Sequence, residues 1–116
     1  MRLDRSDVID FIGVSKSGDR VVLTLADDFE GPDQGLRCSM LQEKVHHYLD
    51  FVASGQVWEH LMRPVPVGQG RSTVIVEILI AAKHDLDGDG RRFLAELQGV
   101  AGSEGVELRF KRLGGS

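Results

Sequence analysis

The sequence predicts an α+β fold, a two-layer sandwich in which a four-stranded mixed sheet packs against two helices on one of its faces. Apolar residues alternate or run together in four short segments, and they recur every three or four residues in two longer ones. The order of these segments is ββαβαβ, which favours a sheet with helices packed on it. At 116 residues, 41% of them hydrophobic, the chain has the size and composition of one domain, so residues 1–116 are expected to fold together.

The first half of the chain predicts a β-hairpin followed by a helix. Residues 8–14 and 20–26 are rich in Val, Ile and Leu, as strands are, and the residues between them include Gly18, which suits a hairpin loop. A helix is expected from about residue 36 to 53, where the apolar positions are Leu41, Val45, Tyr48, Leu49 and Val52. Gly55 is expected to lie just beyond its end.

The second half begins with a loose connection and a third strand. Three apolar residues of the connection are expected to cover the core: Val57, Trp58 and Leu61. Residues 73–82 form the predicted strand, with Val76, Ile78 and Ile80 facing the helices. Ile75 and Leu79 then lie on the opposite face of the sheet.

A second helix and a last strand complete the predicted fold. The helix is expected from about residue 88 to 103, with an apolar stripe made of Phe93, Leu97, Val100 and Ala101. Residues 106–110 alternate between apolar and charged side chains, as a strand does, and residues 111–116 are expected to be a frayed end. Because helices connect the last three strands, these strands should be parallel, whereas the hairpin makes the first antiparallel. The preferred strand order is 2-1-3-4.

This topology gathers acidic residues at one end of the sheet, namely Asp4, Asp7, Asp27, Asp28, Glu30, Asp33, Asp85, Asp87 and Asp89. Basic residues gather at the other end, namely Lys16, Arg20, Arg63 and Arg71. Carboxylates near helix N-termini stabilise them by about 0.3–1 kcal/mol each, but this set exceeds what two helices require. Asp27 and Asp28 therefore predict an acidic surface suited to a basic partner.

Charge and composition exclude several classes of protein. A formal net charge of −4 with no basic stripe argues against nucleic-acid binding. No apolar run approaches the ~20 residues of a membrane-spanning helix, and the polar N-terminus does not resemble a signal peptide. Cys38 is the only cysteine, which fits a reducing compartment, and it is expected to be a packing residue. A cytoplasmic protein is therefore expected.

Residues 85–96 match the spacing of an EF-hand calcium loop, with a glycine at the sixth position. The four candidate ligands are Asp85, Asp87, Asp89 and Glu96. Three features count against a site: Arg92 stands at the eighth position, where an aliphatic residue is usual, a strand precedes the loop, and the chain has no second loop. Cation binding at these four residues is therefore the alternative hypothesis.

Residues suited to catalysis are sparse. Glu43 and His46 have the spacing of carboxylate–histidine metal sites, but such sites require the pair twice and the chain has it once. The sequence contains no phosphate-binding loop or nucleophile elbow, and no ordered serine, histidine and carboxylate set. A metal-dependent enzyme based on Glu43 and His46 is the third hypothesis, and the expected protein is not an enzyme and has no cofactor.

The leading hypothesis is a protein-interaction module that acts through its acidic end or its bare sheet face. With both helices on one side, Ile75 and Leu79 would be exposed on the other side. Large apolar patches of this kind usually bind a partner, so we expect a protein partner or a homodimer that buries this face.

Several segments of the chain also resemble a known family. They are DVIDFI (7–12), VVLTL (21–25), LQEK (41–44), YLDFV (48–52), GRRFL (90–94) and ELRF (107–110). Together they resemble a family of small bacterial proteins known only as a domain of unknown function. The resemblance spans nearly the whole chain. It implies a cytoplasmic α+β domain and supplies no activity.

Overall fold

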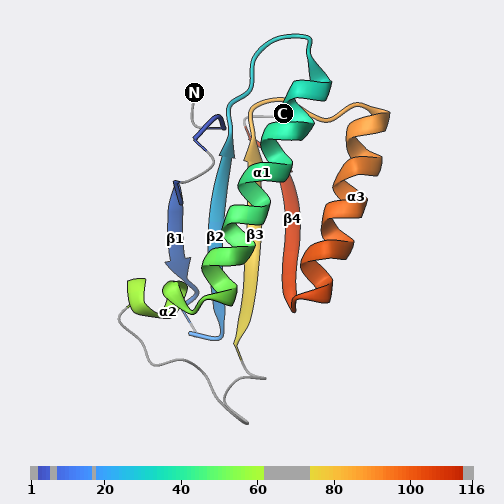
Figure 1. Ribbon diagram of the computed structural model, residues 1–116. Helices are drawn as coiled ribbons and strands as arrows, with labels where there is room; N and C mark the ends of the chain where they lie inside the picture. Colours follow the sequence, from blue (N-terminus) through green and yellow to red (C-terminus); the bar gives the residue numbers. More distant parts are fainter. Residues whose placement is uncertain (1–2, 6–7, 17, 62–73, 114–116) are drawn as a thin grey trace.

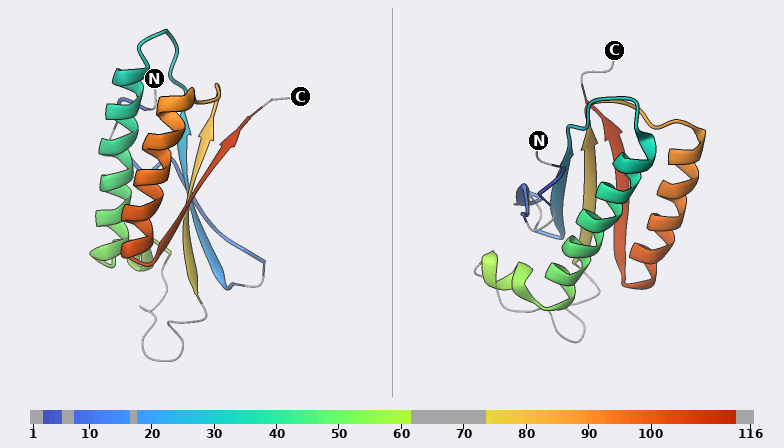
Figure 2. Two further views of the ribbon diagram at one scale, coloured as in Figure 1. Left: turned by 90° about the vertical axis from the view of Figure 1, so that its right-hand side faces the viewer. Right: turned by 45° about the horizontal axis from the view of Figure 1, so that its top comes forward.

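A four-stranded sheet forms one layer of the protein and helices form the other (Figure 1). The computed structural model describes residues 3–5, 8–16, 18–61 and 74–113. Within them the elements are β1 (Phe11–Val14), β2 (Arg20–Asp27), α1 (Gln34–Ala53), α2 (Gln56–His60), β3 (Ile75–Ala82), α3 (Gly88–Ser103) and β4 (Val106–Arg112). Figure 2 shows α1 and α3 on the same side of the sheet, so the predicted two-layer α+β architecture is confirmed.

The strands lie in the order β1-β2-β3-β4. β1 is antiparallel to β2, whereas β2, β3 and β4 run parallel, which confirms the predicted directions. The predicted order 2-1-3-4 is wrong. β2 and β3 are eight residues long and pair with each other over their full length. In the middle of the sheet, the backbone N–H and C=O groups of these long apolar strands find hydrogen-bond partners. The four-residue β1 lies at an edge.

β1 is shorter than the predicted strand over residues 8–14 because Asp10 turns its side chain into the protein. Its carboxylate oxygen Oδ2 accepts a hydrogen bond from the backbone N–H of Ala26 at 2.9 Å. Its own backbone N–H donates to the hydroxyl of Tyr48, also at 2.9 Å. At Asp10, hydrogen bonds to the side chains of Asp10 and Tyr48 thus replace backbone hydrogen bonds between the two strands, and β1 begins one residue later.

Two further segments differ from the prediction. The connection after α1 contains the short helix α2, in which Val57 and Trp58 are buried, so their predicted contribution to the core is confirmed. β4 continues through Lys111 and Arg112, which pair with the last two residues of β3, where the sequence predicts a frayed end.

Each long helix begins at an aspartate cap. Oδ1 of Asp33 accepts a hydrogen bond from the backbone N–H of Leu36 at 3.0 Å, which satisfies a free donor at the start of α1. Oδ1 of Asp87 accepts from the N–H of Gly90 at 2.7 Å at the start of α3. α1 ends before Gly55 as predicted, and the φ angle of 82° at Gly55 is a left-handed conformation that favours glycine.

The core lies between the sheet and the two long helices. The helix-facing residues of β2 and β3 are almost completely buried, together with the apolar stripe of α1. They are Val21, Leu23, Leu25, Val76, Ile78, Ile80, Leu41, Val45, Tyr48 and Leu49. In α3, Leu97 and Ala101 are buried, whereas Val100 is exposed and does not belong to the stripe in which the sequence analysis placed it.

Candidate functional site

Arg37 is almost fully buried beyond the carboxyl end of β2. Its Nε and Nη2 donate to Oδ2 of Asp27 at 2.9 and 2.7 Å. Nη2 and Nη1 donate to the backbone carbonyl oxygens of His84 and Asp85 at 2.6 and 2.8 Å. The guanidinium therefore ties together α1, the end of β2 and the loop before α3.

Asp27 and Asp28, the acidic residues predicted to contact a partner, both make contacts within the protein. Asp27 is 1% exposed and pairs with Arg37, so the expectation that it forms part of an exposed surface is not met. Asp28 is half-buried and accepts a hydrogen bond from the backbone N–H of Leu3 at 3.1 Å. Three other residues of the predicted charge pattern lie outside the described residues: Asp7, Arg63 and Arg71.

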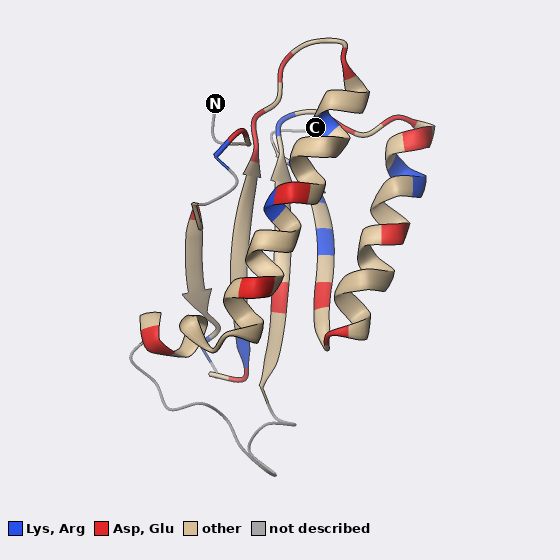
Figure 3. Cartoon of the chain, viewed as in Figure 1, with Lys and Arg blue, Asp and Glu red and all other residues tan. Residues whose placement is uncertain are grey.

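Glu30 is paired at the surface of the same end. One carboxylate oxygen forms an ion pair with Nζ of Lys83, and the other lies 3.1 Å from Nε2 of His84. The hydrogen bond from Lys83, followed by that with His84, lowers the pKa of Glu30 below its ordinary value of 4.5. Figure 3 shows Lys and Arg among the Asp and Glu at this end, so the acidic surface is in part neutralised.

α1 carries a second buried cation, Lys44, whose burial the sequence analysis did not predict. Its Nζ lies 2.7 Å from Oδ2 of Asp10, and both side chains are almost fully buried. The hydroxyl of Tyr48 contacts the same carboxylate at 3.3 Å. The signal that could have revealed both cations is their place on the helix, because Arg37 and Lys44 fall on the same stripe as the apolar residue Leu41.

The residues that match a calcium loop form the start of α3 in this structure. Asp87 is the helix cap described above. Oδ1 of Asp85 accepts from the backbone N–H of Leu86 at 2.9 Å, which lowers the pKa of Asp85, and its Oδ2 lies 3.1 Å from Arg91. Glu96 lies in the middle of α3. The described part of the chain contains no group of three or more His, Cys, Asp or Glu residues able to hold a metal ion.

Gly90, the glycine at the sixth position of that pattern, is explained by close packing. A Cβ atom at this position would lie 3.1 Å from Oδ1 of Asp87 and 3.1 Å from side-chain atoms of Leu86. The glycine therefore lets the first turn of α3 approach its own cap. No calcium-loop turn is needed to account for it.

Glu43 and His46, the other candidate metal ligands, lie exposed on the outer face of α1. With His47 they line a shallow hollow of about 820 Å³. Cys38 is half-buried on the same helix. Burial, followed by the charge of Asp87, raises the pKa of the Cys38 thiol, which favours the neutral form over the nucleophilic thiolate.

The side of the sheet that faces away from the helices carries exposed apolar residues, and we call it the open face. Strand register places Phe11, Thr24 and Leu79 next to one another across β1, β2 and β3. Phe11 is 56% exposed and Ile75 is 39% exposed, while Val22 and Leu79 are half-buried. The predicted exposure of Ile75 on this face is therefore confirmed, and Phe11 of β1 is a further exposed apolar residue on it.

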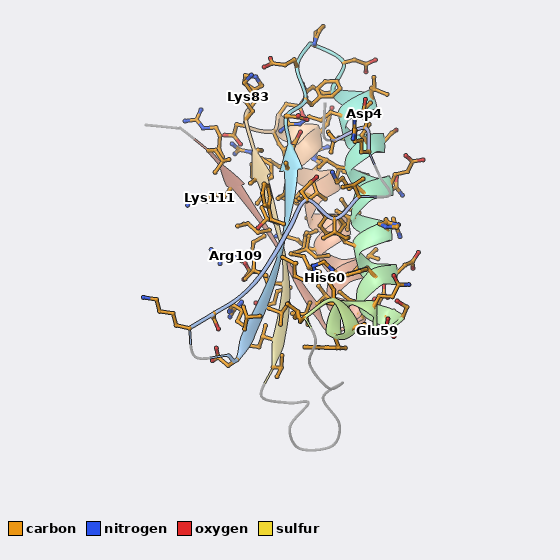
Figure 4. The ribbon with its side chains drawn as sticks, turned by 90° about the vertical axis from the view of Figure 1, so that its left-hand side faces the viewer. Asp4, Glu59, His60, Lys83, Arg109 and Lys111 are labelled. Carbon is orange, nitrogen blue, oxygen red and sulfur yellow. The ribbon has the colours of Figure 1, made fainter. Side chains whose placement is uncertain are left out.

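Charged residues cross the open face from the start of β2 to β4. Arg20 lies 2.6 Å from both Glu77 and Glu107, and Arg109 lies 3.4 Å from Glu77. These cations cover Glu77, which is only 2% exposed. Figure 4 shows Arg109 and Lys111 pointing away from the helices. The open face thus carries apolar residues of β1, β2 and β3 and a charged cluster that crosses it. Arg20 begins β2, Glu77 lies between Ile75 and Leu79 on β3, and Glu107 and Arg109 lie on β4.

The comparisons with known proteins agree with the fold and add no activity. The chain belongs to a family of unknown function, DUF6572, whose family model matches residues 1–114. No curated protein and no solved structure matches the chain. Among the described residues, no helix is both long and apolar enough to cross a membrane.

Proposed function

We propose that this member of the DUF6572 family is a non-enzymatic protein-interaction module whose contact surface is the open face of the sheet. The observation that carries the proposal is the exposure of Phe11 and Ile75 beside Val22 and Leu79. Burying a large apolar side chain is worth ~1.5–3 kcal/mol, so covering this face would stabilise a complex. Exposed apolar side chains next to charged ones are typical of surfaces that bind other proteins.

The same observations favour a protein partner over other partners. The formal net charge is −4, which opposes binding to nucleic acid or to an anionic membrane surface. The single cysteine and the family resemblance favour a bacterial cytoplasmic protein.

Comparative affinity capture tests this function. Three immobilised proteins are needed: the unaltered chain, the double variant Ile75→Thr/Leu79→Thr, and Leu36→Thr. Leu36 is an exposed apolar residue of α1, so its variant is a matched control on the opposite layer. The proteins that each one retains from a cell lysate, further copies of this chain included, are quantified by mass spectrometry.

The unaltered chain and the Leu36→Thr control are expected to retain the same partner, and the double variant is expected to lose it. Thr keeps strand propensity, so the loss would not come from unfolding, and circular dichroism verifies this. Equal retention by all three proteins would contradict the proposal.

A further inference from the structure

A hollow lies at the upper end of the open face, where β2 and β3 end. It has a volume of about 280 Å³ and is lined by Ala26, Asp27, Asp28, Ala81, Lys83 and Leu113. Ala26 and Ala81 are direct neighbours across β2 and β3, and their small side chains leave the space open. Asp28 and Lys83 give its border one charge of each sign.

Phe11 lies on the same face and close to this hollow. It pairs with Thr24, which is two residues before Ala26 on β2. Two residues of a strand span about 7 Å, and adjacent strands are about 4.8 Å apart. The chain therefore presents one exposed aromatic ring and one hollow on a single surface, separated by a short distance.

We infer that the partner of the open face is a second copy of this chain, related by a two-fold axis, with Phe11 of each copy in the hollow of the other. This inference rests on the proposed function and names its partner. A two-fold contact is self-complementary, so a ring and a hollow on the same face form two equal contacts at once. Each ring would lie beside the ammonium group of Lys83 from the other copy, where a cation–π contact adds to the burial.

The size of the open face sets the expected strength of the dimer. The strands have four, eight, eight and seven residues, and at ~3.3 Å per residue and ~4.8 Å between strands they cover about 430 Å² per copy. Two such faces bury about 860 Å², which is below the ~1,000 Å² of a stable interface and typical of a weak, transient one. Association is therefore expected in the micromolar range, and the charged residues of β4 oppose further edge-to-edge growth.

Two complementary variants test the contact. Phe11→Thr removes the ring, and Ala81→Ile fills the hollow; both residues lie on the outer side of the sheet and their substitutes favour strands. Sedimentation equilibrium is run on the unaltered chain, on each variant alone and on an equal mixture of the two. Leu36→Thr is the control for an apolar change on the opposite layer.

Each variant alone is expected to dimerise at least about tenfold more weakly than the unaltered chain, as when a central aromatic contact is lost. The control is expected to dimerise normally. The mixture is expected to associate more tightly than either variant. In the mixed dimer one ring–hollow contact is native, and in the other the added Ile side chain occupies the space of the missing ring.

Three results would overturn the inference, namely an unaltered chain that stays monomeric at hundreds of micromolar, a Phe11→Thr variant that dimerises normally, or a mixture no tighter than its components. The failure of the proposed function is distinct from these. If Ile75→Thr/Leu79→Thr still loses a captured partner while Phe11→Thr has no effect on dimerisation, the open face remains the contact surface and only the ring–hollow contact is wrong.

Discussion

The two faces of the sheet are built from alternate residues of the same strands, yet they differ in almost every property. On β2, Val21, Leu23 and Leu25 face the helices and are at most 1% exposed, whereas the residues between them are only half-buried. The helix-covered face determines whether the chain folds. The apolar residues of the open face remain partly exposed, so they contribute less to folding than those under the helices.

The charged residues on the two faces differ in the same way. Under α1, Arg37–Asp27 and Lys44–Asp10 are ion pairs almost without contact with water. On the open face the cation Arg20 is about one-third exposed, although its partner Glu77 is almost fully buried. Breaking a buried ion pair is costly because one partner is left in the core as an isolated charge, whereas an ion pair exposed to water contributes little to stability. Substitutions on the two faces should therefore have different consequences.

The largest effect is expected from Arg37→Met. This change leaves Asp27 buried without its cation and leaves the carbonyl oxygens of His84 and Asp85 without donors. The free energy of unfolding is expected to fall by about 3–5 kcal/mol, as measured by urea denaturation. A loss below about 1 kcal/mol would mean that the pair is solvated.

Combining Arg37→Met with Asp27→Leu is expected to recover part of that loss. The double variant removes both charges, so no isolated ion remains in the core. Recovery should be incomplete because the two carbonyl oxygens still lack their donors. Strict additivity of the two single changes would contradict the direct pairing of these side chains.

Lys44→Met should have the next largest effect, about 3 kcal/mol, at the lower end of the range for breaking a buried pair. Asp10 keeps the hydrogen bonds from Ala26 and Tyr48, which partly stabilise its charge after the lysine is lost. Urea denaturation measures the change. A smaller loss for Arg37→Met than for Lys44→Met would contradict this ranking.

On the open face, Ile75→Thr/Leu79→Thr is expected to change the free energy of unfolding by about 1 kcal/mol or less, since partly exposed positions tolerate substitution. The same variant is expected to lose self-association. Denaturation and sedimentation equilibrium, run on one preparation, measure the two effects. A large loss of stability without any change in association would place this face in the core.

A small pH effect is expected at Glu30. Its pKa is lowered in the folded protein by Lys83 and then His84, so the stability it contributes is present above its unfolded pKa and lost as the pH falls through the folded value. Glu30→Gln should therefore melt at a slightly lower temperature at neutral pH, and the difference should disappear in acid. A difference that grows in acid would contradict this assignment.

Calcium is expected to have no effect below the millimolar range. Asp87 caps α3 and Asp85 contacts Leu86 and Arg91, so ion binding would require the start of the helix to rearrange. Isothermal titration tests this, with Asp85→Ala as the control. Micromolar binding that disappears in the control would restore the cation hypothesis for residues 85–96.

Much of the fold could be predicted because local signals determine it. Periodic apolar residues identified the long helices, and Gly55 marked the end of α1. Strand order could not be predicted, because it depends on which long strands form backbone hydrogen bonds with each other. The strand predicted from residue 8 also fails at Asp10, whose side chain contacts distant parts of the chain.

The candidate site could be predicted only in part. Alternation placed Ile75 and Leu79 on the open face, because side chains of a strand point to opposite sides in turn. The hollow could not be predicted, since it depends on Ala26 and Ala81 meeting across two strands that are distant in sequence. The negative charge at the acidic end of the sheet was overestimated, because in the folded chain Arg37 forms an ion pair with Asp27 and Lys83 forms one with Glu30.

Methyl NMR over a range of protein concentrations tests most directly whether the open face is the contact surface. We predict that the methyl signals of Val22, Ile75 and Leu79 shift or broaden as the protein concentration rises. Those of Ile78 and Ile80, on the helix-covered face of the same strand, should stay unchanged. Concentration-dependent changes confined to the helices, or to none of the methyl groups up to millimolar protein, would contradict the account.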